Sequence, residues 1–148
     1  IMGAALTAFT NPVVLHRLRD AATVQRWAPL TLHQTSADIA ARTSGAQRVL
    51  TLGPLYALEG GADIYVELAS GSVVYRTADS LTEGEQATTH TIGPATLAAL
   101  VEAHPPAAVV VGVERRGLSV LEEPLLEAIG PDWRVETYPD GIVAYFPP

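Results

Sequence analysis

The feature that most constrains this fold is an unbroken apolar run at residues 107–113, AAVVVGV, which directly follows Pro105 and Pro106. Valine is β-branched and favours strands, and seven residues is the length of a strand rather than of a helix. Because no polar residue alternates with the apolar ones, neither side of this strand can face water. We therefore expect a central strand that is covered on both faces and lies next to a second buried strand at residues 48–53.

Helical and extended patterns alternate around these two strands. Ser80 and Glu83 have the spacing of a capping box, in which a hydroxyl and a glutamate three residues later bond each other's backbone amides. The turn Pro139-Asp140-Gly141 between two apolar runs is typical of a hairpin. Helices are predicted at residues 12–28, 30–44, 54–59, 80–88, 94–104 and 118–129, further strands at 63–68, 134–138 and 142–146, and a short strand or strand-like loop at 73–75.

This order of elements predicts an α/β fold: a three-layer sandwich with a mostly parallel sheet, two N-terminal helices and a C-terminal β-hairpin. We expect a single α/β domain over residues 1–148, with a helical lead-in at 1–45 and the sheet core at 46–148. Residues 1–9 are apolar, and an isoleucine precedes the methionine. This start indicates a fragment of a larger membrane protein, beginning at the trailing end of a membrane span.

Charge and cysteine content exclude several classes of protein. Sixteen acidic residues oppose nine arginines, there is no lysine, and the net charge is −7. A protein that binds duplex nucleic acid or docks on an anionic membrane surface needs the opposite balance. The absence of cysteine excludes disulfides, thiol catalysis and zinc sites built on thiolates.

The sequence lacks the familiar patterns of catalytic or cofactor-binding residues. The turn after residues 48–53 has one glycine, Gly53, where a dinucleotide-binding loop needs several, and a P-loop needs a lysine. The four histidines lack the spacing of metal ligands, and no serine lies in a G-x-S-x-G elbow. We therefore predict no catalytic residue, no metal ligand and no cofactor.

One segment, residues 54–76, gathers carboxylates, tyrosines and an arginine between glycines, beside the carboxyl end of the first strand. An open α/β sheet keeps its ligand crevice at such an end. One interpretation is a site for a saccharide or a lipid-phosphate head group, and the other is an internal network in which Arg76 pairs with Glu59 or Glu67. The candidate ligand-binding residues are Glu59, Tyr65, Glu67, Tyr75 and Arg76.

Residues 27–76 carry a resemblance to a known family. The matching order is WAPLTLH at 27–33, RVLTLGPL at 48–55, LEGG at 58–61, IYVE at 64–67, and then Gly71 through Tyr75 and Arg76. This order resembles the stretch that follows the last membrane helices in bacterial multi-pass glycosyltransferases similar to dolichyl-phosphate-mannose-protein mannosyltransferases.

The resemblance implies a soluble C-terminal domain on the extracytoplasmic side of the cell membrane. In that family, sugar transfer from a polyprenyl-phosphate donor takes place in the membrane part, which this chain lacks. The chain is thus expected to be a non-catalytic domain that assists substrate binding or stabilises the membrane part of the same polypeptide. A saccharide or a polyprenyl-phosphate head group is the expected ligand, and nucleic acid is not a partner.

Two alternatives from other classes remain open. The first is a small soluble α/β enzyme whose pocket uses Glu59, Glu67, Arg76 and His90. The second is a structural or dimerisation module that presents the edge of its C-terminal hairpin to a partner.

Overall fold

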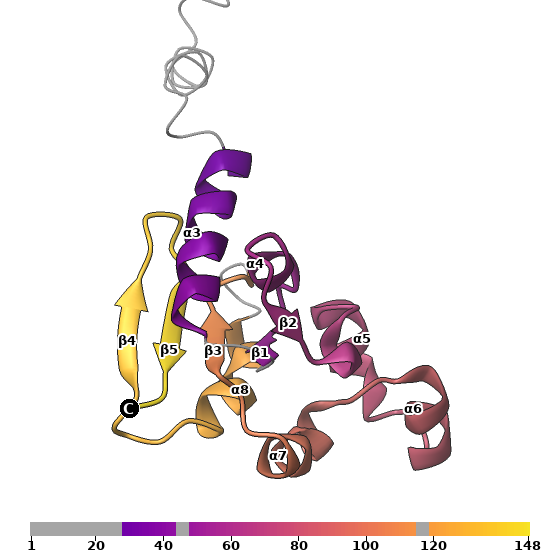
Figure 1. The fold of residues 1–148 in the computed structure, drawn as a ribbon. Coiled ribbons are helices and arrows are strands. Elements are labelled where there is room, and N and C mark those ends of the chain that lie inside the picture. Colours follow the sequence, from indigo (N-terminus) through magenta and orange to yellow (C-terminus); the bar gives the residue numbers. More distant parts are fainter. Residues whose placement is uncertain (1–27, 44–47, 115–118) are drawn as a thin grey trace, which may run out of the picture.

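The computed structural model describes residues 28–43, 48–114 and 119–148 (Figure 1). Its helices are α3 (Ala28–Arg42), α4 (Leu55–Leu58), α5 (Ser72–Ala78), α6 (Glu83–Thr89), α7 (Pro94–Ala103) and α8 (Glu123–Glu127), with short 3-10 helices η2 (Val66–Leu68) and η3 (Ser119–Glu122). Its strands are β1 (Arg48–Thr51), β2 (Asp63–Ile64), β3 (Ala108–Val111), β4 (Arg134–Thr137) and β5 (Val143–Phe146). In these ranges no helix has the length and apolar character that crossing a bilayer requires. The helix predicted at residues 12–28 lies outside the described residues except for its last position.

The five strands form one sheet in the order β2-β1-β3-β5-β4. The prediction that residues 107–113 form a central strand beside the first strand is confirmed, since β3 lies between β1 and β5 and all four of its residues are buried. The pairs β1–β2 and β1–β3 are parallel, whereas β3–β5 and β4–β5 are antiparallel. The sheet is therefore mixed and not mostly parallel, because the C-terminal hairpin joins the same sheet and adds two antiparallel pairings.

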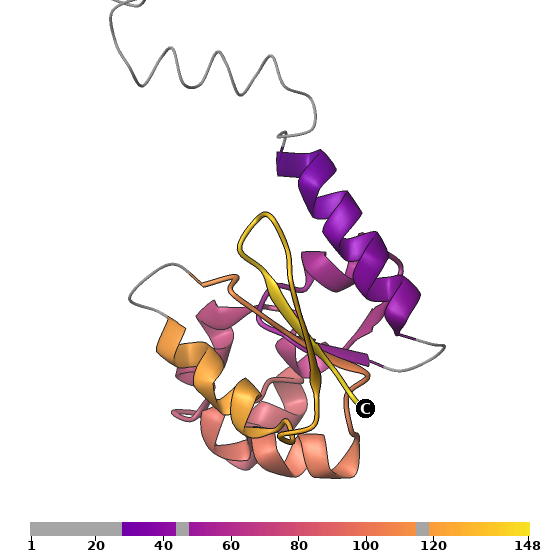
Figure 2. The same ribbon diagram turned by 90° about the vertical axis from the view of Figure 1, so that its left-hand side faces the viewer.

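Alternate residues of the central strands face two separate apolar clusters. Val109 and Val111 belong to a cluster completed by η2, α5, α7 and α8, while Ala108 and Val110 belong to a cluster completed by α3, α4 and β5. Figure 2 shows α3 (indigo) and α8 (orange) on opposite sides of the strands. The expectation that the central strand is buried on both of its faces is confirmed. The fold is thus α/β, with the sheet at its centre.

Three local predictions were wrong. Residues 73–75 belong to helix α5, since Gly71 adopts a left-handed φ of 65° and turns the chain directly into a helix that buries Tyr75 and Ala78. The strand predicted at 63–68 ends at Ile64 and continues as a 3-10 helix. The capping box of α6 is formed by Thr82 and Glu85, two residues later than predicted.

Candidate functional site

An apolar pocket of about 540 Å³ lies at the carboxyl ends of the two central parallel strands. Three segments that are distant in the sequence form its wall. The first turns of α3 contribute Ala28, Pro29 and Leu32; the turn after β1 and the start of α4 contribute Gly53, Pro54, Leu55 and Tyr56; and Val113 follows β3. We call this site the carboxyl-edge pocket.

The chain topology explains why a pocket lies here. The connection from β1 to β2 runs through α4, which packs on the apolar cluster of α3 and β5. The connection from β3 to β4 runs through η3 and α8, which pack on the other cluster. Because the two connections leave β1 and β3 toward opposite faces of the sheet, they separate at the carboxyl ends of these strands. Open α/β sheets bind their ligands in the crevice at this position.

A buried carboxylate fixes the β3 side of the pocket. Glu122, which is only 4% exposed, accepts hydrogen bonds from the backbone N–H of Gly112 (3.0 Å to each carboxylate oxygen) and of Val113 (3.1 Å). Gly112 has a φ of 90°, and a Cβ there would lie 2.6 Å from the backbone oxygen of Gly141 in the hairpin turn. Both oxygens of Glu122 are therefore engaged in holding the turn that carries Val113 to the pocket.

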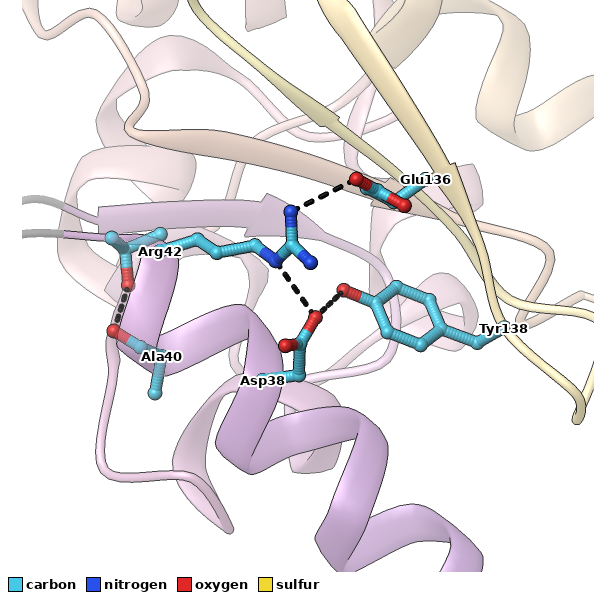
Figure 3. A network of polar contacts seen from close by, with 6 residues as sticks. Asp38, Ala40, Arg42, Glu136 and Tyr138 are labelled. Atoms are coloured by element: carbon cyan, nitrogen blue, oxygen red, sulfur yellow. Dashed lines mark hydrogen bonds and ion pairs between the residues drawn. The ribbon is translucent and has the colours of Figure 1, made fainter.

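A polar network ties the C-terminal half of α3 to the C-terminal hairpin (Figure 3). In this network, Tyr138 donates a hydrogen bond of 2.6 Å to Asp38, and Arg42 pairs with Asp38 at 2.8 Å and with Glu136 at 2.9 Å. The hydrogen bond from Tyr138, with help from Arg42, lowers the pKa of Asp38. Burial and the bond to Asp38 raise the pKa of Tyr138. Because these groups tie helix α3 to β4 and its turn, the wall formed by α3 has a fixed position.

The two tyrosines of the sequence-predicted ligand site lie in the core. Tyr65 and Tyr75 are almost fully buried in the cluster that η2, α5, α7 and α8 share. The Tyr65 hydroxyl donates to the backbone oxygen of His104, while the buried Tyr75 hydroxyl has no hydrogen-bond partner. Burial raises the pKa of each hydroxyl to about 12. The ring faces of these tyrosines therefore pack against other side chains instead of being presented at the surface.

The three charged residues of that predicted site are not brought together. Glu59 is exposed and pairs with His33, with 3.1 Å between its Oε1 and the His33 Nδ1. Glu67 is partly buried, and its Oε2 has no hydrogen-bond partner. Arg76 lies on the exposed side of α5. Among the described residues it makes no ion pair with Glu59 or Glu67, so the predicted internal network is not formed. A role for these residues in binding a ligand stays a prediction.

Other polar groups singled out from the sequence lie apart. His90 is exposed and ends helix α6 with a left-handed φ of 49°. Within the part of the chain that the structure describes, no three histidine or acidic side chains lie close enough to hold a metal ion.

Sequence reasoning placed a ligand crevice at the carboxyl end of the first strand, but none of the ligand-binding residues that it named lines the carboxyl-edge pocket. The run of two parallel strands, β1 and β3, already placed a crevice at their carboxyl ends. The residues directly after these strands, Gly53, Pro54 and Val113, are those that line it. No local sequence pattern predicted that α3 lines the pocket, since this depends on how the helix packs on the sheet.

We found no match to this chain among the protein-family models, the curated proteins or the solved structures with which it was compared.

Proposed function

We propose that this chain is a non-catalytic extracytoplasmic domain of a membrane glycosyltransferase, and that its carboxyl-edge pocket binds an apolar partner. In this proposal the domain is a three-layer α/β sandwich that assists substrate binding or stabilises the membrane part of the same polypeptide. The observation that carries the proposal is the pocket itself: it is open, almost wholly apolar, and lies where an α/β sheet binds its ligands.

The pocket coincides with the segment that resembles the glycosyltransferase family. Every lining residue except Val113 falls within residues 27–76. If that resemblance reflects common ancestry, the stretch that follows the membrane helices in the family is also the stretch that builds the pocket. This coincidence supports a role in contacting either the membrane part or the polyprenyl portion of a substrate.

The chemistry of the pocket supports binding over catalysis. The nearest buried carboxylate is that of Glu122, and its two oxygens already accept hydrogen bonds from Gly112 and Val113. A general acid or base must be free to exchange a proton with a substrate. Glu122 therefore acts by shaping the pocket, and the remaining lining groups are mostly hydrocarbon.

Binding of an apolar ligand can be measured directly by NMR. A short prenyl phosphate is titrated into the isotope-labelled chain, and the amide signals of Leu55 and Val113 are expected to shift in a saturable manner. Inorganic phosphate serves as the control for the head group. Shifts of these signals with both compounds would mean that the protein recognises the phosphate group and not the prenyl chain. No shift at either residue would contradict the proposal.

Two leucines on helix α4 form a matched pair of variants. Leu55 lines the pocket and is 63% exposed, whereas Leu58 is 51% exposed and does not line it. Neither is a core residue, so glutamine at either position leaves the fold intact. Leu55→Gln is expected to weaken prenyl phosphate binding, and Leu58→Gln to leave it unchanged. Equal effects of the two substitutions would contradict binding in the pocket.

A further inference from the structure

The carboxyl-edge pocket opens at the point where the preceding part of the chain joins the domain. Ala28, the first residue of α3, is a lining residue, and Leu32 lies one turn further along the helix. Any segment directly upstream of residue 28 therefore starts at the rim of the pocket, which gives it a high effective concentration there.

The upstream segment combines apolar residues at helical spacing with arginines. Within residues 12–27 the apolar residues Leu15, Leu18 and Ala22 recur at intervals of three and four, a spacing that predicts one face of an amphipathic helix. A helix of this kind that docks in an apolar groove is a common mode of recognition. Leu32, Leu55 and Val113 supply the apolar groove on the domain.

Charge on the two surfaces is complementary. Residues 1–27 contain three arginines and one acidic residue, a net charge of +2. The parts of the chain that the structure describes contain fifteen acidic residues and four arginines. One of these acidic residues, Asp140, lies beside the pocket: burial raises the pKa of the lining residue Tyr56, and the nearby Asp140 adds to this rise. Opposite charges at the rim of an interface favour association, here of the arginine-containing segment with the acidic domain.

We propose that residues 12–27 dock in cis on the carboxyl-edge pocket, with Leu15, Leu18 and Ala22 facing Leu32, Leu55 and Val113. This inference rests on the proposed function, in which the pocket binds an apolar partner, and it names that partner as the chain's own upstream segment. Docking of this segment holds the part of the chain that precedes it in a fixed position beside the carboxyl ends of β1 and β3. An added apolar ligand then has to displace the segment.

The absence of cysteine makes a direct test possible, since one introduced thiol carries one label. A nitroxide is attached to His16→Cys in the otherwise unchanged chain, far enough from Ala28 along the chain that an undocked segment would hold it mostly away from the pocket, and the broadening of amide signals is measured. Leu55 and Val113 are expected to broaden strongly, and Glu102 on α7, which packs on the other face of the sheet, to remain sharp. Equal broadening at the pocket and at Glu102 would overturn the proposal.

A mixed sample shows whether residues 12–27 dock on their own molecule or on a second copy. Nitroxide-labelled chain at natural isotope abundance is combined with isotope-labelled chain that carries no nitroxide. Sharp signals at Leu55 and Val113 in this sample support docking in cis. Broadening there would show that the segment docks on a neighbouring molecule, which would overturn the proposal as stated.

Substitutions separate the failure of this inference from the failure of the proposed function. Leu18→Asp places a charge on the docking face and should abolish the broadening at Leu55, whereas Leu58→Gln should preserve it. Leu18→Asp should also tighten prenyl phosphate binding by about tenfold if the segment covers the pocket for about nine-tenths of the time. Prenyl phosphate binding without nitroxide broadening would overturn only the docking of residues 12–27. Loss of both would overturn the proposed function as well.

Discussion

Replacing Glu122 by alanine tests whether this buried carboxylate shapes the pocket. The substitution leaves two backbone N–H groups without their acceptor, and a hydrogen bond to a charged group contributes about 1.5–3 kcal/mol. Gly112 is exposed, so water can replace the carboxylate there, whereas Val113 is half-buried and is solvated poorly. We therefore expect Glu122→Ala to lower the free energy of unfolding by about 2–4 kcal/mol.

Urea denaturation followed by circular dichroism measures this loss. With a slope of about 2 kcal/mol per molar urea, which is typical of a small protein, the midpoint should fall by about 1–2 M. Glu122→Gln keeps the shape and one acceptor oxygen, so its midpoint should lie between those of the alanine variant and the parent. The neighbouring Glu123 is exposed and has no side-chain hydrogen bond among those of the described residues, which makes Glu123→Ala the matched control.

Equal midpoints for Glu122→Ala and Glu123→Ala would refute the reasoning, because the carboxylate of Glu122 would then contribute nothing beyond surface charge. Hydrogen exchange gives a second, local measurement. The Val113 amide should exchange faster in Glu122→Ala than in Glu123→Ala, since it loses its acceptor only in the first variant.

Three further predictions concern the elements around the pocket. Gly60→Ala should destabilise the chain by about 1–3 kcal/mol or more, because the new Cβ would clash with the Ser36 backbone where α4 crosses α3. Gly61→Ala adds only the cost of a side chain at a φ of 83°, about 1–2 kcal/mol, and thermal or urea unfolding that ranks it as the costlier change would contradict the close approach of the helices. Thr82→Ala removes the N-cap of α6 and should cost about 1 kcal/mol, measured by the same method, and a cost near zero would mean that the capping box contributes little. The lowered pKa of Asp38 means that its stabilising effect is present above the unfolded value of 3.8 and is lost as the pH falls through the lower folded value; Tyr138→Phe should move this pKa back toward 3.8 in an NMR titration of the carboxyl group, and an unchanged pKa would exclude Tyr138 as its main cause.

The central part of the fold was predictable because its signals are strong and local. The apolar run at residues 107–113 has one physical solution, a strand buried on both faces, and the turn Pro139-Asp140-Gly141 requires a residue at positive φ, which Gly141 supplies with a φ of 87°. Helix α7 likewise begins at Pro94 and ends before Pro105, as the pattern indicated.

The errors arose where local propensity and tertiary packing disagree. Val73, Val74 and Tyr75 favour a strand by residue type, but burial of Tyr75 and Ala78 on one helical face outweighs that preference. The capping box was predicted two residues too early because Ser80 and Thr82 both precede a glutamate by three residues. Spacing alone therefore fits both positions equally well.

The candidate site was harder to predict than the fold. Tyrosine and glutamate in a glycine-rich segment suit a ligand and a core equally well, and only packing shows that Tyr65 and Tyr75 lie inside. The pocket draws its wall from α3, α4 and the end of β3, and no local pattern reports contacts between segments so distant in the sequence.

The position of β5 has a consequence for how the chain acquires its structure during synthesis. This strand is the last in the sequence order, yet it lies between β3 and β4 and supplies Ala144 and Phe146 to the core. Until it leaves the ribosome, the central valines of β3 lack one of their two neighbouring strands, and one face of the sheet is incomplete. Pairings between distant segments form slowly, and unpaired strand edges expose a nascent chain to aggregation. We therefore expect the domain to fold only after translation has passed residue 146, as one late cooperative event and not helix by helix as the chain emerges.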